Sequence, residues 1–187
     1  MPRFIIYACP QGPLAEQVQD YLDQSRGQIG RNAAHAYPPH CTLTGFFEDD
    51  PGVIPGDLQR LEQLLQQSLS SCSHPPLQVQ GLSLQPGWLG LNLDSPWLKQ
   101  LVVAFATSAN GGRRQTPIKP KSWLHLTLAN GFPWAHQAPL TALARGLVNP
   151  GAAVSWELRY YQRDPGGGWR CHQAWPLPGS PARGPAL

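Results

Sequence analysis

The feature that most constrains this chain is a pair of matching segments, HCTLTGFF starting at His40 and HLTLANGF starting at His125. Both fit the pattern HxTLxxxF. The residues upstream match in spacing as well, because the same number of positions separates Phe4 from His40 and Leu89 from His125. A shared eight-residue pattern at corresponding places in two halves indicates an internal duplication.

The hydrophobic pattern around these segments predicts short strands alternating with amphipathic helices. Apolar runs rich in β-branched and aromatic residues predict strands over 4–9, 40–47, 77–84, 88–93, 123–129, 154–162 and 169–175. Apolar residues at helical spacing predict helices over 13–26, 57–71 and 140–147, and another that begins at Ser95-Pro96. We therefore expect one bilobal domain over 1–175, with repeats over about 1–84 and 85–175, and a disordered Pro/Gly/Ala-rich tail over 176–187.

Composition limits the classes of function. The chain has 187 residues, 41% of them hydrophobic, which is enough for one sizeable domain or two small lobes sharing a cleft. The net charge of +3 suits an anionic ligand but falls short of the basic excess expected of a general nucleic-acid binder. No apolar stretch is long enough to span a membrane, and the N-terminus has no secretory signal.

The four cysteines argue for a reducing compartment. Cys9, Cys41, Cys72 and Cys171 are scattered and form no CxxC pair or Cys/His pair at zinc spacing. We expect reduced core residues in a cytoplasmic protein. No obligate protein partner is evident.

Side chains alternate between the two faces of a strand, so each matching segment presents its polar residues on one face. His40 and Thr42 point the same way, as do His125 and Thr127, while the residues between them point into the opposite, apolar layer. If the two halves pack about a pseudo-twofold axis, the two pairs converge on one cleft.

Two imidazoles and two hydroxyls in one cleft suit hydrolysis or transesterification of a phosphodiester. Attack at phosphorus needs a base for the incoming hydroxyl and an acid for the leaving oxygen, and histidine fills either role because its unperturbed pKa is about 6.5. The threonine hydroxyls would hydrogen-bond the non-bridging oxygens as negative charge develops. This arrangement requires no metal and no cofactor. The equivalence of the halves leaves open which histidine is the acid.

The two HxTL segments in a duplicated strand–helix chain resemble the signature of the 2H phosphoesterase superfamily, which includes 2′-5′ RNA ligase-like proteins, RNA 2′,3′-cyclic phosphodiesterases and ADP-ribose cyclic phosphodiesterases. The resemblance covers about residues 3–175. It implies an α+β fold of two pseudo-symmetric lobes, with antiparallel sheets lining a central cleft and helices on the outside. It also implies metal-independent opening of cyclic phosphates.

On this resemblance His40, Thr42, His125 and Thr127 take the four motif places. One departure concerns the place shortly after the second motif, where ligase-like members commonly carry an arginine. Here that place has Ala129-Asn130.

Other residues are weaker candidates for contact with the substrate. A basic cluster leads into the second motif and could hold a phosphorylated ligand, with Lys119 and Lys121 favoured because they lie nearest the strand; the cluster also includes Arg113 and Arg114. Phe47, Phe132 and Tyr161 could stack on a base at the rim of the cleft, although core packing is favoured for both phenylalanines because that residue type is usually buried.

The expected activity is hydrolysis of a 2′,3′-cyclic phosphate, or a related ribose cyclic phosphate, on a nucleotide or RNA end. One alternative is a ligase or transesterase that uses the same four residues in reverse and joins RNA ends through 2′-5′ linkages. Another is a non-catalytic module that binds a nucleotide or RNA end in the same cleft. A metal-dependent hydrolase is a third option, and full activity in the presence of a chelator would exclude it.

Overall fold

The computed structural model describes residues 1–71, 77–111 and 114–178. Its helices are α1 (Pro13–Gln28), α2 (Ile54–Ser71), α3 (Pro96–Asn110) and α4 (Gln137–Leu147), with short 3-10 turns η1 (Ala33–Ala36), η2 (Pro51–Val53) and η3 (Trp134–His136). Its strands are β1 (Arg3–Gln11), β2 (Cys41–Thr42), β3 (Phe47–Glu48), β4 (Gln78–Gln85), β5 (Trp88–Asp94), β6 (Leu124–Asn130), β7 (Ser155–Arg163) and β8 (Trp169–Pro176).

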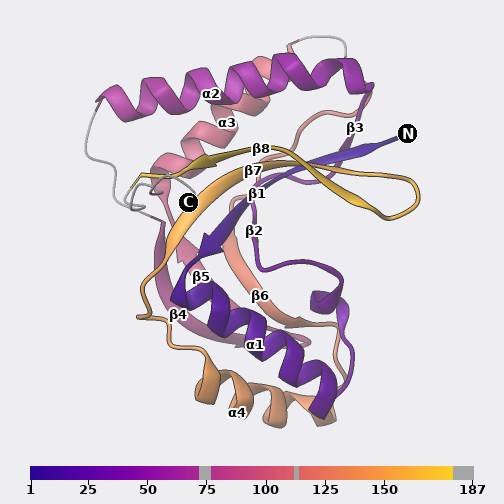
Figure 1. The fold of residues 1–187 in the computed structure, drawn as a ribbon, viewed down its shortest axis with the longest axis vertical. Coiled ribbons are helices and arrows are strands. Elements are labelled where there is room, and N and C mark those ends of the chain that lie inside the picture. The colour runs from indigo at the N-terminus through magenta and orange to yellow at the C-terminus, as the bar shows by residue number, and fades with distance from the viewer. Residues whose placement is uncertain (72–76, 112–113, 179–187) are drawn as a thin grey trace, which may run out of the picture.

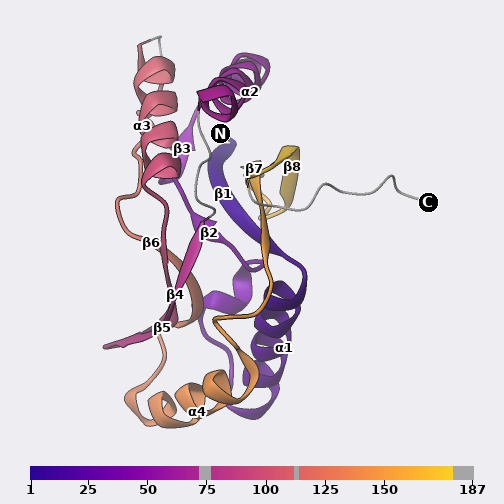
Figure 2. The same ribbon diagram turned by 90° about the vertical axis from the view of Figure 1, so that its left-hand side faces the viewer.

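The strands form a single antiparallel sheet in the order β4-β5-β6-β2-β1-β7-β8, with β3 pairing beside β1. In Figure 1, α2 and α3 lie together at one end of the molecule and α1 and α4 at the other, with the sheet between them. Figure 2 shows how strongly the sheet is twisted between the two helix pairs. The predicted α+β class, with antiparallel strands and helices on the outside, is confirmed.

The two sequence repeats exchange strands. β4 comes from the first repeat but pairs with β5 of the second, and β7 and β8 come from the second repeat but extend the sheet beyond β1. The lobes are therefore not contiguous in sequence, and they meet where β2 pairs with β6.

The registers also correct the predicted equivalence upstream of the motifs. Tyr7 lies opposite Thr42, whereas Gly90 lies opposite Thr127 after a bulge at Leu89 and Gly90. Gly90 is thus the structural counterpart of Tyr7. It lies two positions before the residue that the equal spacing of the two repeats predicts as that counterpart.

One predicted strand, over 40–47, is broken into β2 and β3. Between them the chain bends toward the loop before β6, where Thr44 forms an isolated bridge with Pro120 and the amide of Gly45 donates to the Lys119 carbonyl. The amide of Ile6 in β1 donates a hydrogen bond to the Thr44 hydroxyl at 3.1 Å. This bond takes the place of the backbone hydrogen bond that a continuous neighbouring strand would offer to β1. A hydroxyl at this position therefore allows the strand to break at little cost in hydrogen bonding.

The core lies on the helix-covered face of β1, and a smaller cluster lies on its other face. Phe4, Ile6 and Ala8 pack into the main core. Ile5 and Tyr7 face the opposite way; the cluster there comprises Ile5, Tyr7, Cys9 and Tyr161, packed against Phe46 and Trp169. This second face of the sheet carries the site described below.

Two further expectations need correction. The fold extends past the predicted boundary at 175, because Pro176 belongs to β8 and Leu177 is buried and donates its amide to the Trp156 carbonyl. Cys9 and Cys41 are buried free thiols as expected, but Cys171 is exposed. Cys72 and residues 179–187 lie outside the described residues. Within the described ranges, no helix combines the length and the apolar character needed to cross a membrane.

Candidate active site

The two motif segments are brought side by side by the pairing of β2 with β6. Cys41 lies opposite Leu126 in this antiparallel pair. That register places His40 opposite Thr127 and Thr42 opposite His125. Cβ atoms of opposite residues are about 5 Å apart in such pairs. The four motif side chains therefore form a compact group on one face of the sheet, related by an approximate twofold axis.

All four residues line one cavity of about 370 Å³. His40, Thr42, His125 and Thr127 are each half-buried, whereas the residues between them are buried on the opposite face. The remaining lining residues come from β1, from α1 and the segment after it, from the bend between β2 and β3, from the loop before β6 and from the end of β6: Ile5, Tyr7, Leu22, Ala33, Ala34, Tyr37, Pro38, Thr44, Gly45, Phe46, Lys121 and Asn130.

The His40 ring is held in one orientation. Its Nδ1 atom lies 2.7 Å from the Pro38 carbonyl oxygen, which only accepts, so Nδ1 carries a proton and donates it. In the neutral ring Nε2 is then the unprotonated nitrogen, free to take a proton. The Tyr7 ring packs against the imidazole with centroids 4.0 Å apart, and the Tyr37 ring lies 5.6 Å away.

The His125 ring has an equivalent setting. It packs against Trp123 with centroids 4.0 Å apart and meets Trp88 edge-on at 5.3 Å. Burial lowers the pKa of this ring, and the Trp123 carbonyl, which lies two residues before His125 as Pro38 lies two residues before His40, partly opposes that shift. The buried Nδ1 atom nevertheless makes no hydrogen bond of ordinary geometry.

Trp88 also orients Thr127. The indole Nε1 donates to Thr127 Oγ1 at 3.1 Å, so the proton on the threonine hydroxyl remains free to donate to a ligand. Gly90, opposite Thr127, makes room for this contact: a Cβ there would meet the Leu126 carbonyl oxygen at 2.3 Å and the Trp88 ring at 2.6 Å. Any larger residue at position 90 would displace Trp88 from the hydroxyl.

Burial lowers the pKa of both histidines. For His40 the opposing effect is the Pro38 hydrogen bond, which raises its pKa, and the nearby His125 lowers it further. For His125 the Trp123 carbonyl raises the pKa, and the positive charge of Lys121 lowers it. The effect of His125 on the pKa of His40 shows that the two rings lie close enough to interact electrostatically.

The basic cluster divides in the structure. Lys121 lines the cavity, but Lys119 lies outside the lining and is exposed; its carbonyl binds Gly45. Arg114 is buried away from the cavity, where it pairs with Asp49 at 3.3 Å and with Asp57. Arg114 thus fixes the loop before β6 to the start of α2. Arg113 lies outside the described residues.

The three aromatic candidates for base stacking do not line the cavity. Phe47 is fully buried against Phe4 and Tyr160, and Phe132 is buried in the main core, so neither can stack on a ligand. Tyr161 is buried as well, and its hydroxyl accepts from Arg159 at 3.1 Å. Core packing, the favoured role of Phe47 and Phe132, is thus confirmed, whereas Tyr161 packs beside Tyr7 and Trp169 on the cavity side of the sheet without lining the cavity.

Strand alternation, applied further along the chain, finds the residues that were missed. From His40 onward, Thr44 and Phe46 follow Thr42 on the cavity face, and both line the cavity. The repeat pattern points instead to Phe47, which lies one position away and on the core face. Tyr37 also lines the cavity; it precedes the motif in a loop, where no periodic pattern predicts its direction.

A third histidine fixes the loop that carries Tyr37. The amide of Asn32 donates to His35 Nδ1 at 3.0 Å, so the buried ring is neutral at that atom and carries its proton on Nε2, which lies 3.0 Å from Ser25 Oγ. The Ser25 hydroxyl donates in turn to the Leu22 carbonyl. Burial lowers the pKa of His35. This network ties η1, one wall of the cavity, to α1.

Among the described residues, no group of three or more His, Cys, Asp or Glu side chains is arranged to hold a metal ion. The donors around the cavity are imidazoles, hydroxyls, one amide and one ammonium group. Such a set can accept and donate protons and can neutralise an anion, which is the chemistry of acid–base catalysis on a phosphate ester.

Comparisons with known proteins give relatives that are much longer than this chain. No protein-family model matches. The chain is 30% identical over 200 residues to an ecdysteroid-phosphate phosphatase of Drosophila melanogaster, a match that covers 88% of this chain and 26% of the relative. It is 33% identical over 166 residues to the mouse ubiquitin-associated and SH3 domain-containing protein A, covering 87% and 26%. The chain therefore spans about a quarter of the length of the curated relatives it matches.

A solved structure, that of Kluyveromyces marxianus Usb1, aligns with a TM-score of 0.46 and 13% identity over 95% of this chain and 97% of that one. A likeness of this size supports no conclusion about activity.

Proposed function

We propose that this chain is a 2H-type phosphoesterase that hydrolyses a 2′,3′-cyclic phosphate on a nucleotide or RNA end, with His40 and His125 as its acid–base pair. The observation that carries the proposal is the register of β2 and β6. It sets the two imidazoles and two hydroxyls around one cavity as a near-symmetric group. Opening a cyclic phosphate needs a base and an acid on opposite sides of the phosphorus, and a twofold arrangement supplies them.

The proposed reaction moves two protons. One neutral imidazole takes a proton from water as its oxygen bonds to phosphorus, and the other, protonated imidazole gives a proton to the ribose oxygen as its bond to phosphorus breaks. Thr42 and Thr127 donate to the non-bridging oxygens, where charge builds in the transition state. Lys121 supplies positive charge at the cavity that Ala129 and Asn130 do not.

The relatives support the coarser part of the proposal. Proteins named ecdysteroid-phosphate phosphatase in two insects are about 30% identical to this chain, which favours hydrolysis of a phosphate ester. The cyclic diester, in contrast, is proposed from the site itself, because paired histidines without a nucleophile suit attack by water on a strained ring.

A panel assay without added metal tests the proposal. The four nucleoside 2′,3′-cyclic phosphates and an RNA ending in a cyclic phosphate should each give a ring-opened monoester, with unchanged rates in excess chelator. A phosphate monoester such as p-nitrophenyl phosphate should be cleaved far more slowly. Longer RNA products would indicate a ligase instead. Binding without turnover would leave only the binding-module alternative.

The pH dependence of kcat/KM should be bell-shaped, with its maximum on the acid side of about pH 6.5, the ordinary histidine value. Burial lowers the pKa of both imidazoles. Activity falls as pH drops through the lower pKa, because the base gains a proton. It also falls as pH rises through the higher pKa, because the acid loses its proton. Initial rates at substrate concentrations well below KM measure this profile.

Lys121→Met provides the matched test of this profile. The substitution removes the charge that lowers the pKa of His125. One limb of the bell should therefore move to higher pH while the other limb stays in place, and KM should rise because a cation at the phosphate is lost. A maximum above pH 8, or a profile in which neither limb shifts on substitution, would contradict the assignment of His125.

A further inference from the structure

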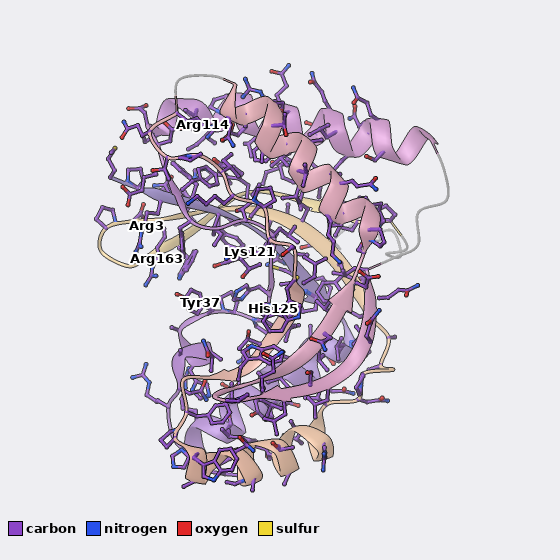
Figure 3. The ribbon with its side chains drawn as sticks, turned by 180° about the vertical axis from the view of Figure 1, so that it is seen from behind. Arg3, Tyr37, Arg114, Lys121, His125 and Arg163 are labelled. Atoms are coloured by element: carbon purple, nitrogen blue, oxygen red, sulfur yellow. The ribbon has the colours of Figure 1, made fainter. Side chains whose placement is uncertain are left out.

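Two arginines lie beyond the catalytic cavity on the same face of the sheet. Arg3 lies directly opposite Arg163 across the β1–β7 pair. Strand alternation puts Arg3 on the face that carries Ile5 and Tyr7, both of which line the cavity. Figure 3 shows both arginines on the side of the molecule that also carries Tyr37, Lys121 and His125.

Neither guanidinium has an ion-pair partner among the described residues. Glu48 lies opposite Arg3 on the other side, in β3, but makes no ion pair with it in the described structure. Like charges opposite each other on neighbouring strands repel and destabilise the sheet. An anion bound between Arg3 and Arg163 would remove this repulsion.

Aromatic rings connect the arginines to the catalytic cavity. We call Tyr37, Phe46 and Trp169 the aromatic rim. The Arg163 guanidinium carbon lies 5.9 Å from the Tyr37 ring and 5.3 Å from the Trp169 ring, and that of Arg3 lies 5.0 Å from the Phe46 ring.

The aromatic rim continues up to a catalytic residue. The rings of Tyr37 and Phe46 lie 5.7 and 6.0 Å from that of Trp169, and both residues line the cavity. The Tyr37 ring centroid is also 5.6 Å from that of His40. One aromatic residue therefore separates Arg163 from the catalytic imidazole.

This order of groups fits a ligand with two phosphates. The catalytic group takes the cyclic phosphate, the aromatic rim offers faces for a ribose and base, and two arginines lie at the far end. Guanidinium groups bind phosphate oxygens with paired, charge-assisted hydrogen bonds. A nucleoside cyclic phosphate without a second phosphate would leave both arginines unused.

We propose that Arg3 and Arg163 bind a second phosphate of the substrate, carried on the 5′ oxygen of the nucleoside whose cyclic phosphate is opened. This inference rests on the proposed function, because it assumes that the catalytic group holds the other phosphate. Both a 5′-phosphorylated nucleotide and the last nucleotide of an RNA strand have this chemistry.

Binding of product-like ligands tests the inference independently of turnover. Calorimetry should show that adenosine 3′,5′-bisphosphate binds on the order of 10- to 100-fold more tightly than adenosine 3′-monophosphate. In the Arg3→Gln/Arg163→Gln variant this preference should disappear while the affinity for the monophosphate stays the same. The exposed Arg145 and Arg170 provide a charge-matched control, since Arg145→Gln/Arg170→Gln should keep the preference.

Three results would overturn the inference: no preference in the wild-type chain, a preference that survives in the Arg3/Arg163 variant, or an equal loss of affinity for both ligands. The last would mean that the arginines shape the site without contacting the second phosphate. A dinucleotide with a 3′-phosphate, adenylyl-adenosine 3′-phosphate, separates the two sources. Tighter binding of the dinucleotide than of the bisphosphate indicates an RNA end, and the reverse order indicates a free nucleotide.

The outcomes also separate this inference from the proposed function. A chain that prefers the bisphosphate but opens no cyclic phosphate contradicts only the proposed function. A chain that opens cyclic phosphates without any such preference contradicts only the role of Arg3 and Arg163.

Discussion

Replacing either His40 or His125 with alanine should lower kcat for a nucleoside 2′,3′-cyclic phosphate by about 10²- to 10⁴-fold, since each change removes one proton-transfer group. The double variant should lose little more activity than the single variant with the larger loss, because acid and base act in one step and their effects are not additive. Steady-state kinetics on the purified variants measures both losses.

A matched control distinguishes lost chemistry from lost structure. His136→Ala removes an imidazole at the start of α4, outside the cavity lining, and should leave kcat unchanged. Each catalytic variant should also keep the wild-type circular dichroism spectrum, because both rings are half-buried at the cavity wall and their loss leaves the core intact. Wild-type turnover by a folded His40→Ala or His125→Ala chain would reject the mechanism.

Thr42→Val and Thr127→Val should each lower kcat by about 10²- to 10³-fold with a much smaller change in KM. Valine keeps the shape of threonine but has no hydroxyl to donate to the non-bridging oxygens as their charge increases. The loss therefore falls on the transition state more than on the bound substrate. Fitting kcat and KM separately for each variant tests this division.

The two threonines should differ in a second respect. Thr127 accepts a hydrogen bond from Trp88, so Thr127→Val also leaves a buried indole N–H without a partner. This variant should unfold at lower denaturant concentration than Thr42→Val. Thr107→Val on the exposed side of α3 provides the control, with wild-type kcat and stability. A higher KM with unchanged kcat in the Thr127→Val variant would instead indicate a role in binding alone.

Much of the local structure follows from patterns within the chain. The bounds of β1, α1, β5 and β6 agree with the predicted ones to within a few residues, because their apolar residues recur at the period of the element that they form. The exception is instructive. Residues 40–47 have a strand pattern, yet Thr44 and Gly45 bond to the loop before β6. The strand therefore breaks because of contacts with this loop, which is distant in the sequence.

The residues that sequence reasoning missed at the site have the same explanation. Phe47 and Phe132 matched in the repeat pattern because both pack in the core, and such residues recur in a duplicated fold for reasons of packing. Alternation from His40 would have selected Phe46. Trp169 had no signal at all, since it reaches the aromatic rim only because β8 follows β7, which pairs beside β1.

The sequence alone determined the duplicated pattern, the type of most elements, and the face of each motif strand that carries an imidazole and a hydroxyl. These follow from side-chain period, which depends only on neighbours along the chain. The tertiary structure alone decided that β2 pairs with β6 so that His40 meets Thr127 and Thr42 meets His125. It also decided which basic residues reach the ligand face. Strand pairing and loop direction are set by contacts between residues far apart in sequence, and no local period encodes them.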